Sequence, residues 1–210
     1  MRKKVVCLTL VLCAVFFATP LYASITANDV GNAWSRIAAA ANMKAIPITY
    51  EKDKAPNAWV KFESSSKYSV HVTEGLMQVL KSPDEIAGVL GHEVGHVQLG
   101  HYNKGVKRNV GWSLAAALLG KVGGVAEIAG AVGINLAESG FSREQEVDAD
   151  DYGTDLAVKA GYSPWGLYNA MKSFKDNGFK TVPSGFNSHP PTDRRLQHLA
   201  ERAKKIESGK

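Results

Sequence analysis

The stretch GHEVGHVQLGH, from Gly91 to His101, holds three histidines and one glutamate within eleven residues. On an α-helix, residues four positions apart lie about 40° apart around the axis, so His92 and His96 project from one face and can bind a single metal ion. Glu93 lies about 100° around the helix from His92, too far to be a ligand but close enough to contact a water on the metal. In metal-dependent peptidases with HExxH, zinc lowers the pKa of that water towards about 7, and the glutamate accepts its proton during attack on a peptide carbonyl.

A catalytic zinc site needs a third protein ligand and one open position. His101 is the nearest candidate, but on a continuing helix it projects about 140° away from His96, so helix capping or packing is its expected role. The segment FSREQEVDAD, about fifty residues downstream, holds four acids. On a helix, Glu146 and Asp150 share a face, so Glu146 can bind the metal while Asp150 accepts a hydrogen bond from a ligating histidine. A solvated acidic helix face explains the same spacing, and the residues alone leave both interpretations open.

Small residues favour close contact between the two helices that carry these motifs. Gly153 and Ala157 lie on the face of Glu146, and Gly95 offers the same opportunity on the HExxH helix. We therefore expect the HExxH helix to pack directly against a second helix that carries the glutamate.

The HExxH helix has a strong start signal in Ser82-Pro83-Asp84-Glu85. Ser82 is the expected N-cap, Pro83 suits the first helical position, and Glu85 is expected to close a capping box. This helix is predicted to continue to about Gly100.

The remaining elements indicate an α+β fold, mostly helical with a small β-sheet. Helices are predicted over 27–42, 74–80, 142–160, 163–177 and 192–206, and strands over 46–50, 58–62 and 68–72. Ser163-Pro164 repeats the capped start at the head of the helix that it begins. The apolar segment 110–136 is interrupted by charges and glycines, so we expect two apolar helices or a hairpin against the core, with peripheral membrane contact as the alternative.

The N-terminal stretch MRKKVVCLTLVLCAVFFATPLYAS has the cationic start, apolar run and small residue at Ala23 of a secretory signal peptide. We predict a signal peptide over 1–23 and one domain over 24–210, with an uncleaved anchor as the alternative. Both cysteines, Cys7 and Cys13, fall within this segment, so no thiolate is available to the domain as ligand or nucleophile. An exported, periplasmic protein is expected, either free or associated with a membrane.

The net charge of +5 does not indicate a nucleic-acid partner. Outside residues 1–23 the chain has 22 Lys and Arg against 20 Asp and Glu, so the excess of positive charge is concentrated at the N-terminus. The composition, 45% hydrophobic and 21% charged, is that of a globular domain with an ordinary core.

Three motifs in order, GHEVGHVQLGH, SREQEVDAD and SHPPTDRRL, resemble the HtpX and CAAX-prenyl-endopeptidase family of gluzincin zinc metallopeptidases. The resemblance covers roughly residues 57–199 and is closest to the small exported bacterial branch, which is associated with envelope protein quality control. It implies that Glu146 is the third zinc ligand and that Asp150 supports the site without binding the metal. It also implies that the HPP motif places His189 near the metal and that the family's arginine falls on Arg195.

The expected function is therefore that of a zinc endopeptidase acting on unfolded or misfolded envelope proteins. One Zn²⁺ per chain is expected, with three ligands: His92, His96 and Glu146. Glu93 is the expected general base and acid, and His189 and Arg195 are expected to steady the oxyanion or the substrate. His189 is also a candidate for the fourth zinc position in a resting enzyme.

Two alternatives accompany this expectation. An extended substrate could pair with the strand at 58–62 or with the strand at 68–72. The protein could also be a metal-stabilised chaperone-like or adaptor module that binds clients without turnover. Glu93 favours the enzyme, because a purely structural metal site has no use for a base beside the metal.

Overall fold

A computed structural model describes residues 24–64, 67–101, 141–178, 189 and 191–209. The predicted signal peptide, the apolar segment 110–136 and most of the loop before residue 191 lie outside the described residues and stay predictions. Within the described ranges, none of the helices combines the length and the apolar character needed to cross a bilayer.

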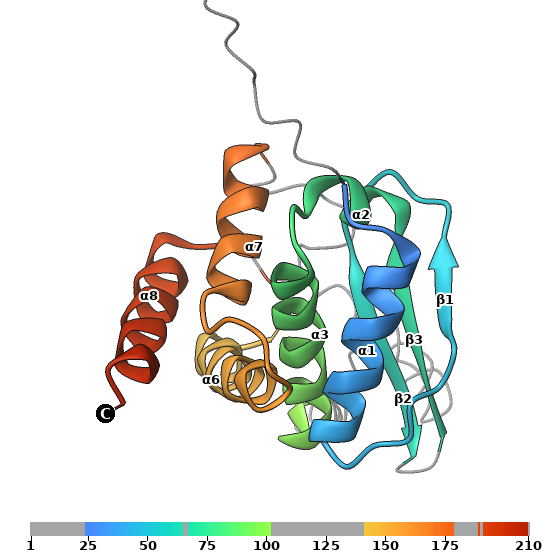
Figure 1. Ribbon diagram of the computed structural model, residues 1–210, viewed down its shortest axis with the longest axis horizontal. Coiled ribbons are helices and arrows are strands. Elements are labelled where there is room, and N and C mark those ends of the chain that lie inside the picture. The colour runs from blue at the N-terminus through green and yellow to red at the C-terminus, as the bar shows by residue number, and fades with distance from the viewer. Residues whose placement is uncertain (1–23, 65–66, 102–140, 179–188, 190, 210) are drawn as a thin grey trace, which may run out of the picture.

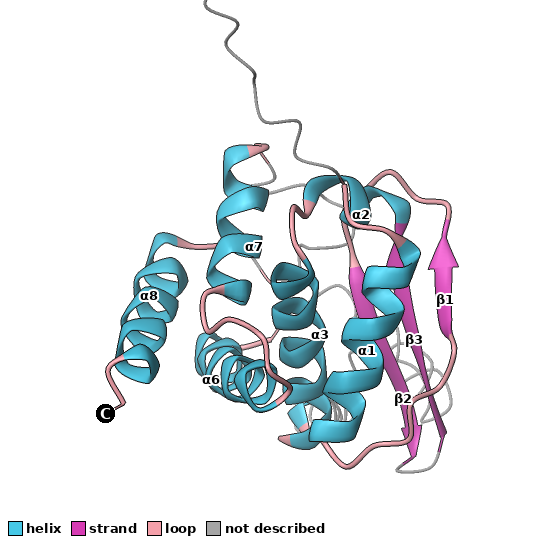
Figure 2. Ribbon diagram, viewed as in Figure 1, coloured by secondary structure: helices cyan, strands magenta, loops and turns pink. Residues whose placement is uncertain are grey.

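The described elements are mostly helices, together with one small β-sheet (Figure 2). In chain order they are α1 (Ala27–Ala40), β1 (Ile48–Glu51), β2 (Ala58–Ser64), β3 (Lys67–Thr73), α2 (Glu74–Val79), α3 (Pro83–Gln98), α6 (Arg143–Lys159), α7 (Gly166–Asp176) and α8 (Asp193–Glu207). The predicted α+β class is confirmed, and each of these elements begins and ends within a few residues of its predicted bounds.

The sheet has the strand order β1-β3-β2, with β1 parallel and β2 antiparallel to β3. Val60 pairs with Val70, and both side chains are buried on the face that meets the helices. Trp34 of α1 packs edge-on against Tyr68 of β3 at 6.3 Å between ring centroids, and its indole nitrogen donates to the Ile46 carbonyl at 2.8 Å. These contacts attach α1 to the sheet and close one side of the core.

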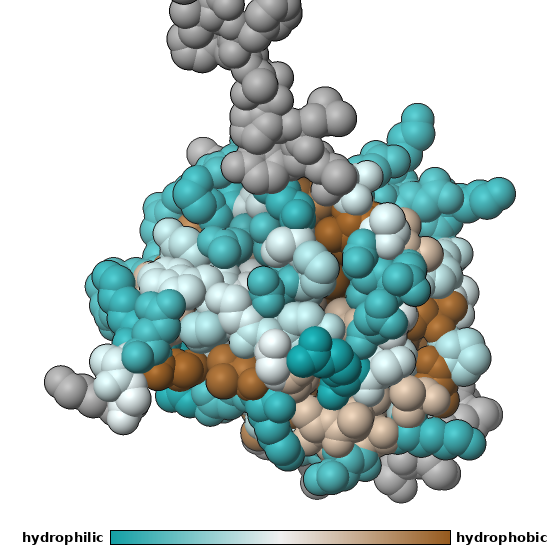
Figure 3. Space-filling model, viewed as in Figure 1, coloured by the Kyte–Doolittle hydropathy of each residue, from teal (hydrophilic) through white to brown (hydrophobic). Residues whose placement is uncertain are grey.

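Helix α3 lies at the centre of the fold, between α1 and β2 on one side and α6 and α7 on the other (Figure 1). Its residues from Glu85 to His96 are all buried, as a helix surrounded by other elements requires. On the face drawn in Figure 3, polar residues cover most of the surface and apolar residues form small separate groups. The HExxH motif is therefore held at the interior of the molecule rather than on an exposed helix.

Glycines bring the backbones of α3 and α6 into direct contact, as the sequence predicts. A Cβ added at Gly153 would lie 2.5 Å from the backbone nitrogen of His92, and one added at Gly91 would lie 2.6 Å from the Gly153 carbonyl oxygen. At Gly95 the corresponding distance to the Ala149 carbonyl oxygen is 3.1 Å. The close approach lets side chains of α3 and α6 meet between the two helices.

The N-terminus of α3 is capped as expected, but without a capping box. The Ser82 hydroxyl accepts from the Glu85 backbone N–H at 3.3 Å. The Glu85 carboxylate does not return to Ser82; it accepts from the Lys81 N–H at 3.0 Å and from the Ser173 hydroxyl of α7 at 3.5 Å. The predicted capping box is therefore wrong, because the carboxylate bonds to the backbone N–H of Lys81, one residue before the expected partner Ser82, and also contacts Ser173 of α7.

The start of α7 also differs from the prediction. The helix begins at Gly166 with Trp165 at the N-cap position, and no side chain caps it. The backbone N–H of Ser163 instead donates to Asp84 of α3 at 2.8 Å, so this residue ties the preceding turn to the HExxH helix.

Candidate metal centre

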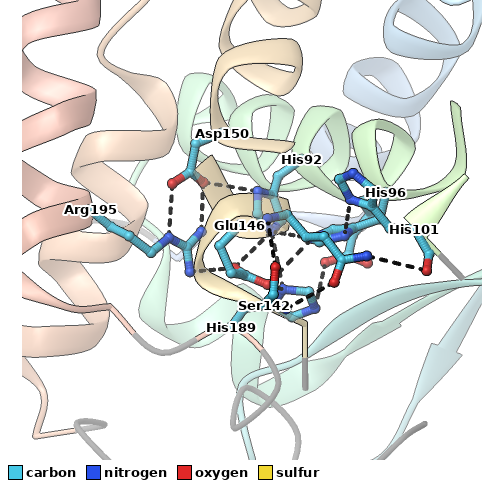
Figure 4. A network of polar contacts seen from close by, with 10 residues as sticks. His92, His96, His101, Ser142, Glu146, Asp150, His189 and Arg195 are labelled. Carbon is cyan, nitrogen blue, oxygen red and sulfur yellow. Dashed lines mark hydrogen bonds and ion pairs between the residues drawn. The ribbon is translucent and has the colours of Figure 1, made fainter. Parts of the chain in front are cut away.

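Four buried side chains converge on one point between α3, α6 and the segment before α8 (Figure 4). They are His92 and His96 from α3, Glu146 from α6, and His189. One potential ligand atom from each lies within 4.8 Å of those from the other three. None of the four residues exposes more than 4% of its surface.

The spacing of the donor atoms fits a small metal ion. The Nε2 atoms of His92 and His96 lie 3.1 Å apart, and the Glu146 carboxylate oxygens lie 3.6 Å and 3.5 Å from them. The Nδ1 atom of His189 lies 3.1 Å from the Nε2 of His92 and 2.9 Å from a Glu146 oxygen. Ligands placed about 2.1 Å from a tetrahedral zinc ion lie about 3.4 Å from one another, so the described side chains suit such an ion.

The charge states of His96 and Glu146 also suit a metal. Burial and the neighbouring imidazoles lower the pKa of His96, so its ring is neutral and has a lone pair to offer. Burial opposes ionisation of Glu146, but the charges of His189 and Arg195 outweigh it and lower the pKa of this carboxyl. Imidazole nitrogens with one carboxylate form one of the donor sets of catalytic zinc sites.

Glu93 lies beside this group but does not belong to it, as the helical spacing predicts. It is 1% exposed, and neither carboxylate oxygen has a hydrogen-bond partner within the described part of the chain. Burial raises the pKa of Glu93, and its Oε1 lies 3.6 Å from the Nε2 of His189. A buried carboxyl group without a partner costs free energy of folding, and such groups concentrate where a protein uses them chemically.

Asp150 contacts the metal-facing histidine from behind. One carboxylate oxygen lies 3.0 Å from the Nδ1 of His92, on the side of the ring away from the other donors. Burial alone would raise the pKa of Asp150, but the Arg195 guanidinium outweighs it and lowers the pKa to about 2. An ionised Asp150 therefore fixes the orientation of the His92 ring.

Arg195 bridges two carboxylates instead of pointing to an open position (Figure 4). Its Nε and Nη2 donate to Asp150 at 2.8 Å and 2.6 Å, and its Nη1 lies 2.6 Å from a Glu146 oxygen. The side chain is 6% exposed. These contacts hold the carboxylates of α6 in place, and the expected role of Arg195 at an oxyanion stays a prediction.

The residues after HExxH supply contacts that sequence reasoning did not assign. The helix ends at Gln98, and the ring of His101, fully buried, places its Nδ1 3.0 Å from the Nδ1 of His96. Phe141 stacks on the ring of His96 at 3.8 Å between centroids. Its place just before the SREQE motif is the only sequence signal for this contact.

Comparison with known proteins gives a consistent result. The sequence model of Peptidase family M48 matches residues 24–203. Metalloprotease LoiP of Escherichia coli (strain K12) is 31% identical over 181 residues, which cover 84% of this chain and 67% of LoiP. Metalloprotease YcaL of the same strain is 33% identical over 176 residues, which cover 80% of this chain and 66% of YcaL. A Protease HtpX homolog of Salinibacter ruber is 26% identical over 190 residues, which cover 70% and 64% respectively.

The chain spans about two thirds of the length of these relatives. The matches confirm the family resemblance that the three motifs indicate. They also confirm the prediction of a metal-dependent hydrolase that acts on peptide bonds.

Proposed function

Because the chain belongs to peptidase family M48, we propose that it is a zinc-dependent endopeptidase with three metal ligands: His92, His96 and Glu146. The observation that carries the proposal is the convergence of these buried side chains on one point, with the carboxyl of Glu93 beside it, which accepts no hydrogen bond from the described residues. A zinc ion held there supplies a Lewis acid that polarises the scissile carbonyl and lowers the pKa of water.

Glu93 is the general base and acid in this proposal. Its carboxyl projects from the helix turns that carry the metal-facing histidines, and no described residue donates a hydrogen bond to either oxygen. The group accepts a proton from the attacking water and returns it to the leaving amine. Its burial keeps competing solvent away while the proton is held.

His189 has two proposed roles that follow one another. Its Nδ1 lies 3.1 Å from the Nε2 of His92 and 2.9 Å from a Glu146 oxygen, which are distances typical of the other donor pairs in the group. In the resting enzyme His189 would therefore hold the fourth position around the metal. A peptide that enters the site would take the place of this imidazole beside His92 and Glu146. The ring of His189 would then donate a hydrogen bond to the oxyanion that forms during attack.

The strand order of the sheet decides which of the two strands considered from the sequence can pair with an extended substrate. β3 is bonded on both edges, to β1 and to β2, so it has no edge free for a peptide. Within the described residues β2 is bonded to β3 alone, and it contacts α3, which carries the HExxH motif. Of the two strands considered from the sequence, we therefore assign substrate pairing to β2.

The setting of the activity is proposed from the sequence. A signal peptide over 1–23 would export the domain to the periplasm, where unfolded or misfolded envelope proteins are the proposed substrates. Such chains offer the extended segments that pairing with an edge strand requires.

The proposal is tested by casein degradation with the purified protein and a Glu93→Gln variant, with zinc content measured for each. The matched control is Glu144→Gln, which removes an exposed carboxylate from α6. One zinc per chain in all three proteins, with cleavage lost only in Glu93→Gln, supports the assignment. Cleavage by Glu93→Gln at the wild-type rate contradicts it. Zinc binding without cleavage by any of the three favours the binding module over the enzyme.

A further inference from the structure

His101 occupies a position that a side chain on a continuing helix could not reach. α3 ends at Gln98, and Gly100 has a φ of 67°, a left-handed conformation that glycine adopts without strain. This turn brings His101 back against the helix, where its Nδ1 lies 3.0 Å from the Nδ1 of His96 (Figure 4). The other nitrogen of His96, Nε2, faces His92 and the metal centre.

The location of one proton decides what this contact does. A neutral imidazole carries a proton on one nitrogen and a lone pair on the other. His96 can offer a lone pair at Nε2 only if its proton lies on Nδ1, which points to His101. The Nδ1 of His101 must then accept the hydrogen bond. If His101 donated instead, His96 would carry its proton on Nε2 and have no lone pair for a metal.

We propose that His101 is a positioning residue for the metal centre. Its Nδ1 accepts a hydrogen bond from Nδ1 of His96, and this bond directs the Nε2 lone pair of the His96 ring to the metal. This inference rests on the zinc site of the proposed function. Asp150 has the corresponding place behind His92, with its oxygen 3.0 Å from the Nδ1 of that ring. Each histidine of α3 thus has its own polar neighbour close to Nδ1, a carboxylate oxygen for His92 and an imidazole nitrogen for His96.

The first turn of α6 keeps His101 in this place. The side-chain amide of Gln145 donates to the His101 carbonyl at 3.4 Å, while its own oxygen accepts from the Ser142 N–H at 2.9 Å. Phe141, just before this turn, covers the His96 ring at an interplanar angle of 25°. The acceptor is therefore fixed by the same helix that carries the third metal ligand.

Two other roles for His101 fit the geometry less well. As a metal ligand it would have to join the converging group, but among the described residues that group consists of other side chains. As a packing residue it would be replaceable by an apolar ring, because burying an imidazole costs free energy unless its polar atoms are bonded. The short contact between the two Nδ1 atoms favours an acceptor over both.

The test compares His101→Phe, which keeps a ring but removes the acceptor, with His101→Asn, whose amide oxygen can take the place of Nδ1. Zinc dissociation constants are measured by competition with a chromophoric chelator, and the absorption of the cobalt-substituted proteins reports ligand geometry. We expect His101→Phe to bind zinc about 10–100-fold more weakly, and His101→Asn to recover most of this loss. Wild-type affinity and cobalt spectrum in His101→Phe, or equal losses in the two variants, would overturn the proposal.

A measurement on the unaltered protein decides the same point without a variant. Nitrogen-15 spectra of the histidine rings in the zinc-bound protein should show His96 protonated on Nδ1; a proton on neither nitrogen or a bond from His101 to zinc overturns the proposal. Proteolysis enters none of these readouts. A wild-type protein that binds no zinc would contradict the proposed function itself, whereas wild-type zinc affinity in His101→Phe would contradict only this inference.

Discussion

The contact between Gly153 and the backbone of His92 predicts that a single added methyl group will disturb the metal centre. In Gly153→Ala the new Cβ would lie 2.5 Å from the His92 nitrogen, 2.7 Å from its Cα and 2.8 Å from the Gly91 carbonyl carbon. All three are backbone atoms, which cannot move aside as a flexible side chain can. α6 must therefore retreat from α3 by about 1 Å to restore ordinary van der Waals separations.

The expected cost of this retreat can be stated for both stability and metal binding. Overpacking of this kind lowers the free energy of unfolding by about 1–3 kcal/mol, partly offset by a gain of up to about 1 kcal/mol in helix propensity. Metal sites tolerate deviations of only about 0.2 Å in ligand distance, and Glu146 and Asp150 lie on the helix that moves. The affinity of the folded protein for zinc should therefore fall as well, in addition to the loss in the free energy of unfolding.

Two matched variants make the experiment quantitative. Gly31→Ala in α1 adds a methyl group with nothing within 4 Å, so we expect unchanged or higher stability and wild-type zinc affinity. Gly95→Ala meets Ala149 at 3.1 Å and should have an intermediate effect. Urea unfolding and chelator competition on the three proteins measure both quantities. Wild-type stability and zinc affinity in Gly153→Ala would refute the reasoning.

Four further outcomes follow from the described contacts. Asp150→Asn should weaken zinc binding about 10–100-fold and lower the stability of the zinc-free protein, because it removes the charge of one of the two carboxylates that the buried Arg195 guanidinium bridges; chelator competition and urea unfolding measure the two effects. Burial raises the pKa of Glu85, so its contribution to stability is greatest at low pH and is lost as pH rises through the raised value. The unfolding temperature of Glu85→Gln should therefore rise relative to that of wild type as the pH increases from 5 to 8, roughly the range above an ordinary carboxyl pKa. A constant difference between the two proteins over this range would contradict the reasoning. Removing the metal with a chelator should abolish casein cleavage and lower the unfolding temperature, with both restored by zinc. The resting role of His189 predicts higher basal proteolysis in His189→Ala and three histidine ligands in the metal-edge spectrum of the zinc-bound wild type; no gain in proteolysis together with only two histidine ligands would contradict it.

Local patterns predicted the parts of the site that lie within one helix. The 3.6-residue period alone places His92 and His96 on one face and Glu93 beside them, and Ser82 marks where that helix begins. The prediction of a capping box by Glu85 was wrong because its carboxylate accepts from the N–H of Lys81, one residue before Ser82, and from Ser173 of α7, a donor that no pattern within the segment reveals. Errors of this kind occur where a polar side chain has partners both near and far along the chain.

The third ligand shows why a pattern within one segment cannot complete such a site. The spacing of Glu146 is equally that of a solvated helix face, and only its family motif separated the two interpretations. This glutamate is buried because α6 packs closely against α3, where Gly153 meets Gly91, a contact between residues about sixty positions apart in the chain. Glycine at 153 and at 95 suggested close packing, but the partner that Gly153 meets depends on how the two helices cross.

For His101 and Arg195, the role depends on where the side chain points in the folded protein. His101 was assigned away from the metal because the helix was taken to continue, whereas the left-handed Gly100 turns its ring back towards His96. Arg195 was expected to steady the oxyanion or the substrate, and in the structure its guanidinium contacts two carboxylates of α6. In both cases residue type indicated that the side chain matters, and only the fold determines which atom it faces. A site assembled from several helices therefore has ligands that sequence can name and supporting contacts that only the packed structure can assign.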